Sequence, residues 1–211
     1  MKCLLVCLLS LILTGCAIGQ SRPKLPYDSW NVFIGAPKYM EVWVESVDVI
    51  DRRGLAYERV HGGVVGYFGD PVGWPLQGVG GGGKPISGVD LPEIIFVRWQ
   101  SLVEPQTYNV RIDIPQWVRN EMIKPQQAYC LGRMAWKTDY ARIISIGMAP
   151  GGIAKAWVGG PCLEPKEIGR FQAKIDKRGP YEGHSGGEYY RPPKRAAQDY
   201  IRQHGIPYGS W

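Results

Sequence analysis

The stretch Thr107–Ile114, TYNVRIDI, decides the fold. Its apolar residues occupy every second position, so they fall on one face of an extended chain and the polar residues fall on the other. This strict alternation predicts a half-buried β-strand. The apolar run 94–103, IIFVRWQSLV, precedes it across only Glu104–Gln106. The two segments therefore predict a β-hairpin.

The same pattern extends outward in both directions. A type II turn at Pro150-Gly151 is indicated because proline presets the first central φ and glycine supplies a positive second φ. The remaining predicted strands are Trp30–Ala36, Tyr39–Ile50 paired with Leu55–Phe68, and Arg142–Met148 paired with Ile153–Val158.

Two short helices interrupt this β pattern. One is predicted over Pro115–Ile123, with proline at its first position, and the other over Pro193–His204, which ends at Gly205. Residues 66–88 are predicted to be a glycine-rich loop. The sequence thus predicts a mainly β protein, a single antiparallel, sandwich-like domain with short helices and a C-terminal helix.

The first residues, MKCLLVCLLSLILTGCAIG, have the pattern of an export signal. The apolar run is too short to span a bilayer but suits a signal-peptide core. Leu13-Thr14-Gly15-Cys16 resembles the bacterial lipobox, which predicts cleavage before Cys16 and acylation of that cysteine. The alternative is an ordinary secretory signal with an incidental cysteine. Ala17, by resemblance to enteric lipoproteins, favours the outer membrane of a Gram-negative cell, with the protein facing the periplasm.

These signals divide the chain into four parts. We expect a signal peptide over residues 1–15, a lipidated tether over 16–26, a mostly-β domain over 27–191, and a C-terminal helix and tail over 192–211. Several acyl chains on Cys16 would anchor the protein stably to the membrane.

The mature chain is basic, because loss of Lys2 lowers the net charge of +6 by only one. In an exported protein this charge favours anionic lipid headgroups or an acidic protein partner over nucleic acid. A solvated surface without any partner is the alternative.

Cys130 and Cys162 are the cysteines that remain after processing and lipidation. Cysteines of an exported domain usually pair, so a disulfide between them is predicted. A nucleophilic thiol or a metal ligand remains as an alternative.

Two motifs imitate catalytic sites. Gly78–Pro85, GVGGGGKP, has proline where a phosphate-binding loop needs Ser or Thr, and no helix follows, so no nucleotide is expected. Gly183–Gly187, GHSGG, matches the nucleophile elbow of α/β-hydrolases, but charged residues replace the apolar strand that should precede it. We therefore expect no catalytic residue, no metal site and no cofactor, and we expect that the protein is not an enzyme.

Other candidate residues have simpler explanations. The histidines, His61, His184 and His204, lack metal-ligand spacing. The carboxylates Glu41, Glu45, Asp48 and Asp51 resemble glycosidase pairs, but a solvated strand face is the expected arrangement. Aromatic residues could stack on sugars, which makes Trp74, Tyr190 and Trp211 candidates for a glycan site.

Several blocks together carry a family resemblance: residues 36–45 (APKYMEVWVE), 92–101 (PEIIFVRWQS), 149–155 (APGGIAK), 160–165 (GPCLEP) and 204–211 (HGIPYGSW). They resemble the domain-of-unknown-function family 2931, a set of Gram-negative lipoproteins, from about Tyr27 to the C-terminus. The resemblance implies no catalytic residue.

Small lipoproteins of this kind accompany type VI secretion effectors as immunity proteins. We expect a membrane-anchored, non-enzymatic protein-binding module, in its most specific form an immunity protein against a secreted effector. The alternative is a cell-envelope glycan binder or glycan hydrolase. The ligand-binding residues are unknown at this stage.

Overall fold

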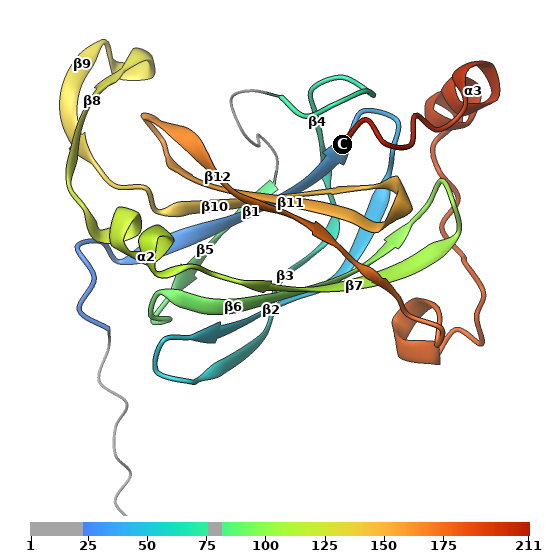
Figure 1. Ribbon diagram of the computed structural model, residues 1–211, viewed down its shortest axis with the longest axis horizontal. Helices are drawn as coiled ribbons and strands as arrows, with labels where there is room; N and C mark the ends of the chain where they lie inside the picture. The colour runs from blue at the N-terminus through green and yellow to red at the C-terminus, as the bar shows by residue number, and fades with distance from the viewer. Residues whose placement is uncertain (1–22, 76–81) are drawn as a thin grey trace, which may run out of the picture.

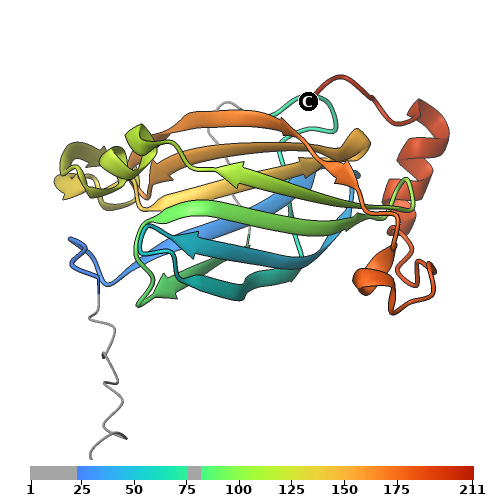
Figure 2. The same cartoon turned by 60° about the horizontal axis from the view of Figure 1, so that its bottom comes forward.

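Two β-sheets lie face to face in the computed structural model, which describes residues 23–75 and 82–211 (Figure 1). Buried apolar side chains of both sheets form one core between them. Figure 2 shows the two layers of strands with the C-terminal helix at one end of the sandwich. The predicted mainly β class, with short helices and a C-terminal helix, is confirmed.

The first sheet is built around the N-terminal strand. Its strands are β1 (Ser29–Pro37), β4 (Gly66–Phe68), β5 (Gly82–Ser87), β10 (Ile143–Ala149), β11 (Ile153–Gly160) and β12 (Leu163–Gln172). The strand order is β12-β11-β10-β1. On the edge of β1 opposite β10, β5 pairs with the first part of the strand and β4 pairs with its last residues. The sequence predicted antiparallel pairing, but β1 is parallel to both β10 and β4. The other pairings are antiparallel, and they include the predicted β10–β11 hairpin.

The second sheet has the order β13-β7-β6-β2-β3 and is antiparallel. Its strands are β2 (Val42–Asp51), β3 (Ala56–Val64), β6 (Pro92–Ser101), β7 (Gln106–Asp113) and β13 (Lys174–Ile175). The predicted hairpin of residues 94–114 is confirmed, with Ile95 opposite Ile112. Along β7 the apolar residues are buried and Arg111 and Asp113 are exposed, as the alternation predicted.

The remaining elements lie at the ends of the sandwich. They are the hairpin of β8 (Gln126–Cys130) and β9 (Ala135–Asp139), the helices α2 (Gln116–Ile123) and α3 (Arg195–His204), and the single turns η1 (Leu131–Arg133), η2 (Pro150–Gly152) and η3 (Pro180–Gly183). Pro115 precedes α2 as its N-cap, and α3 ends at Gly205, whose φ is 72°. Within the described residues, no helix has the length and apolar character to cross a membrane.

The prediction of a loop over residues 66–88 is wrong for residues 66–68 and 82–87, which form β4 and β5 and pair with β1, while residues 69–75 belong to no helix or strand. Glycine is needed in β5 because an aromatic ring packs where a side chain would otherwise lie. The phenyl ring of Phe33 lies 2.4 Å from the position that a Cβ of Gly83 would occupy. A strand that must lie this close to an aromatic ring excludes every larger residue.

Gly35 on β1 tests this reasoning. A Cβ there would lie 2.0 Å from the ring of Phe68, which is fully buried. We expect Gly35→Ala to lower the free energy of unfolding by about 1–3 kcal/mol, since overpacking forces the core to shift. Urea unfolding would measure the change. Gly82→Ala, where the added Cβ meets no atom within 4 Å, is the matched control, and equal losses in both variants would contradict the explanation.

Candidate functional site

A cavity of about 480 Å³ lies on the outer face of the second sheet, where residues 176–185 cross over β2 and β6. Side chains from β2, β3, β5, β6 and this crossing segment line it. The cavity is bordered by Trp43, Arg59, His61, Lys84, Glu182 and His184. We treat it as the candidate functional site because charged and aromatic side chains converge there.

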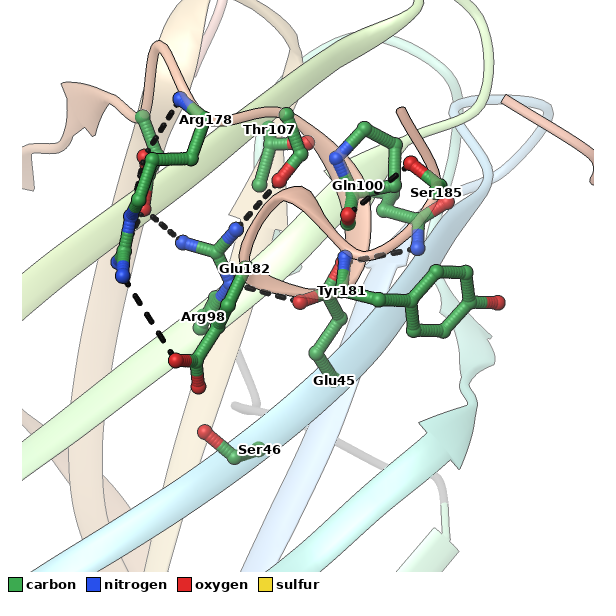
Figure 3. A network of polar contacts seen from close by, with 12 residues as sticks. Glu45, Ser46, Arg98, Gln100, Thr107, Arg178, Tyr181, Glu182 and Ser185 are labelled. Atoms are coloured by element: carbon green, nitrogen blue, oxygen red, sulfur yellow. Dashed lines mark hydrogen bonds and ion pairs between the residues drawn. The ribbon is translucent and has the colours of Figure 1, made fainter. Parts of the chain in front are cut away.

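Arg98 holds the crossing segment on the sheet. Its Nε donates to Glu45 at 2.6 Å, and its terminal nitrogens donate to Asp176 and to the carbonyl oxygen of Gly179. Figure 3 shows Arg98 between Glu45 on β2 and the segment that carries Arg178. Arg98 is only 8% exposed, so its charge is stabilised by these partners rather than by water.

Glu45 uses both carboxylate oxygens for structural contacts. One oxygen accepts hydrogen bonds from the Gln100 amide and from the backbone N–H of Tyr181, each at 2.8 Å, and the other accepts from Arg98. The side chain is 7% exposed. The expectation of a solvated face is therefore wrong for Glu45, which attaches the crossing segment to β2.

Glu41 and Asp51 are also buried. Glu41 accepts hydrogen bonds from the Tyr67 hydroxyl and from the backbone N–H of Lys194. Burial and this contact raise the pKa of Tyr67, so the hydroxyl stays protonated and donates. Asp51 accepts from the side chain and backbone of Arg53, and from other backbone amides. Hydrogen-bond partners explain why burial is tolerated: those of Glu41 are distant in sequence, whereas the cation beside Asp51 is its near neighbour Arg53.

Asp51 and Asp176 have pKa values below the ordinary range. Burial of Asp51 favours its neutral form, but the hydrogen bonds from Arg53 and the nearby amides outweigh burial. Hydrogen bonds from Arg178, and then from Arg98, lower the pKa of Asp176 in spite of its burial. Both groups stay charged in the folded protein at a pH where the unfolded chain takes up protons.

Stability should therefore decrease in acid. A carboxyl group whose folded pKa is depressed stabilises the fold above its unfolded pKa, and the contribution is lost as the pH falls through the folded pKa. We expect the free energy of unfolding to begin falling below about pH 4, the ordinary pKa of Asp. Urea unfolding at a series of pH values measures this. Asp176→Asn should be less stable at neutral pH and should lose less in acid; an acid loss equal to that of the parent would contradict the assignment.

Both ring nitrogens of His61, beside the cavity, form hydrogen bonds with backbone groups. The backbone N–H of Gly62 donates to its Nδ1, so Nε2 carries the proton and donates to the carbonyl oxygen of Gly82 at 2.7 Å. The ring thus links β3 to the start of β5. His184 lines the same cavity and is exposed, while His204 lies on α3.

The open side of the cavity carries the exposed cations Arg59 and Lys84 and one exposed acid, Glu182, which pairs with Arg178 at 3.7 Å. Arg59 and Lys84 are exposed, and neither side chain forms an ion pair with another residue in the part of the chain that the structure describes. Trp43 separates this cavity from a smaller one of about 180 Å³, lined mostly by apolar residues such as Val64 and Tyr67. The Arg191 guanidinium stacks 3.4 Å from the centre of the Trp43 ring. A cationic hollow and an apolar one thus lie side by side.

The described residues of the two motifs that resemble catalytic sites do not have the geometry that those sites require. Ser185 lies in a loop, is buried, and donates its hydroxyl proton to the carbonyl oxygen of Pro180 at 3.0 Å. Lys84 and Pro85 belong to β5 and not to the start of a helix, while Gly78–Gly81 lie outside the described residues. Among residues 23–75 and 82–211, no group of three or more His, Cys, Asp or Glu side chains could hold a metal ion.

The remaining predicted site residues are cysteines and aromatic residues. Cys16 is outside the described residues. Cys130 and Cys162 form a disulfide, with 5.0 Å between their Cα atoms, that joins the end of β8 to the turn between β11 and β12. Trp211 is buried, Trp74 packs edge-on against Trp157, and Tyr190 is exposed. These candidates for a glycan site form no shared exposed platform in the described structure.

The ion pair between Arg98 and Asp176 was not predicted from the sequence. Arg98 interrupts the apolar run IIFVRWQS, where a charged side chain would otherwise be costly to bury. That interruption is a usable sign of a buried ion pair. Nothing in the sequence pattern identifies its partner Asp176, which is 78 residues away.

The fold and the site define a two-sheet β protein with a charged hollow on one outer face. A family model described as a protein of unknown function, DUF2931, matches residues 17–209. The chain belongs to this family, as the sequence blocks suggested. Neither the curated proteins nor the solved structures contain a match.

Proposed function

We propose that this protein is a periplasm-facing lipoprotein of the outer membrane, anchored through Cys16, that acts as a non-enzymatic protein-binding module. Its partner presents an acidic side chain beside an apolar one. In its most specific form the module is an immunity protein that masks a secreted effector.

The observation that carries this proposal is the division of charge at the cavity. The buried acids Glu45 and Asp176 are consumed by contacts that hold residues 176–185 on the sheet. The basic residues Arg59 and Lys84 instead face outward. General acid–base chemistry needs a proton-transfer group within reach of a substrate, whereas binding an acidic surface needs accessible cations.

The smaller cavity adds a second contact. Val64, at its edge, is 70% exposed and Tyr67 is 39% exposed. An apolar side chain of the partner would cover them while a neighbouring carboxylate meets Arg59 or Lys84. Exposed apolar groups next to cations favour protein contact, because hydrophobic burial supplies affinity and charge supplies specificity.

Affinity purification tests the proposal. A tagged, processed form would be isolated from its native cells, and co-eluting proteins identified by mass spectrometry. We expect one stoichiometric protein, lost when Arg59→Glu and Lys84→Glu are combined. Lys177→Glu, an exposed residue outside the cavity lining, is the matched control and should retain the partner. Recovery of no protein, or equal recovery from both variants, would refute this site.

A genetic experiment tests the specific form. Deletion of the gene should sensitise cells to a secreted effector, and the parent protein should restore resistance while the Arg59→Glu, Lys84→Glu variant does not. Deletion that sensitises cells to no neighbouring effector would exclude the immunity role.

A further inference from the structure

The β8–β9 hairpin carries the most exposed apolar surface of the described chain. Leu131 is 78% exposed, Met134 73% and Trp136 71%, and Tyr129 opposite Trp136 is 40% exposed. Large apolar side chains gathered on a projecting tip are unusual for a surface that contacts only water. Figure 1 shows the hairpin standing away from both sheets.

The hairpin and the start of the folded chain lie at the same end of the molecule. The Tyr27 ring packs edge-on against Tyr140, directly after β9, with 5.7 Å between ring centres. The backbone N–H of Asn31 donates to the carbonyl oxygen of Arg142 at 2.8 Å. Figures 1 and 2 agree that the hairpin and the first described residues share this end.

The chain before Pro23 limits the distance to a lipid on Cys16. The seven residues from Cys16 to Pro23 can span at most about 25 Å. The strands of the hairpin, five residues each, project about 17 Å. An anchor on Cys16 therefore holds this end of the molecule, with its apolar tip, within reach of the bilayer.

The charges of the tip suit an anionic membrane surface. Arg133 is exposed at the turn, and Lys137 lies on β9, half-buried and 4.0 Å from Asp139. The acid of the hairpin, Asp139, is buried and accepts a hydrogen bond from the backbone N–H of Cys162. Aromatic residues flanked by lysine and arginine are typical of the headgroup region of a bilayer.

We infer that the tip, residues 129–137, inserts into the anionic phospholipid leaflet that carries the lipid anchor. The tip is a second, non-covalent membrane contact, which fixes the orientation of the domain relative to the bilayer. This inference rests on the proposed anchor at Cys16.

Tryptophan quenching tests the insertion. The processed protein would be placed on vesicles of phosphatidylethanolamine and phosphatidylglycerol that contain lipids brominated along the acyl chains. The difference between the parent and Trp136→Phe isolates the signal of Trp136. We expect this signal to be quenched on vesicles, and less so when phosphatidylglycerol is omitted.

Acidic substitutions in the hairpin tip and at a control position test whether the tip is the part that contacts lipid. Leu131→Glu combined with Met134→Glu should abolish quenching of Trp136 and weaken the vesicle affinity of non-acylated protein about tenfold. Ile175→Glu, at a residue 58% exposed on β13, should change neither. Circular dichroism would check that each variant is folded.

The outcomes separate this inference from the anchor. Unquenched Trp136 in acylated protein on vesicles would overturn the insertion while leaving the anchor intact. Mass spectrometry that finds Cys16 without acyl chains would refute the anchor, and quenching of protein added to vesicles would still support the tip as a lipid contact. Loss of a bound protein, or of self-association, in the charge variant without quenching in the parent would assign the tip to a protein interface and overturn the inference.

Discussion

Arg98→Met should lower the free energy of unfolding by about 3–5 kcal/mol, because it leaves the buried Glu45 carboxylate without a cation and leaves Asp176 with Arg178 alone. Glu45 and Asp176 have side chains that are each only 7% exposed. Glu45 would keep Gln100 and the Tyr181 amide, but neither neutralises its charge. The loss should be measured by urea unfolding at neutral pH.

Arg111→Met is the matched control, since Arg111 also pairs with an acid on the same sheet. Its side chain is 54% exposed and that of Asp113 is 68% exposed, and exposed pairs contribute little. We expect a change much smaller than that of Arg98→Met, because water already solvates both groups of this pair. Adding Glu45→Gln and Asp176→Asn to Arg98→Met should recover part of its loss. Equal effects of the two arginine substitutions would contradict the role given to burial.

Removing the disulfide should have the second largest effect. The bond between Cys130 and Cys162 closes a loop across a sequence separation of 32, which in the chain-entropy model stabilises the fold by about 3–4 kcal/mol. The double variant Cys130→Ala, Cys162→Ala should show this loss in urea. A reducing agent should destabilise the parent by a similar amount and leave the double variant unchanged. A loss below about 1 kcal/mol would mean that the unfolded chain is already constrained.

The sequence predicted those strands in which local pattern and burial agree. TYNVRIDI formed β7 because one face of that strand meets the core, while on the other face Arg111 and Asp113 meet solvent and Thr107 is covered beside Tyr189. The pattern fails for β12, LEPKEIGRFQ, which is polar and contains Pro165 but lies at a sheet edge where both are tolerated. The sequence pattern did not predict the hairpin of residues 126–139, because its buried positions are few and are held by the small or polar residues Ala128, Cys130 and Asp139 while its large apolar residues are exposed.

The site depended on contacts that local pattern does not encode. Glu45 lies on β2 and Glu41 directly precedes that strand, and both carboxylates are covered by residues far along the chain. Nothing in the sequence indicates that Tyr181 and Lys194 contact these carboxylates in the folded protein. Arg59 and Lys84 likewise belong to separate strands and meet only because β3 and β5 converge at the same cavity.

The parallel pairing of β1 with β10 governs the order in which the chain can fold. Asn31 lies beside Ile143 in this pairing, so one long edge of the first strand stays open until more than half of the chain has been synthesised. Contacts of such long range are slow to form, because a large loop must close before they are made. During that interval the strand exposes unpaired amide and carbonyl groups along its edge, which invites pairing with other chains. Holding the emerging chain unfolded until residues 143–149 are available is thus a requirement of this topology.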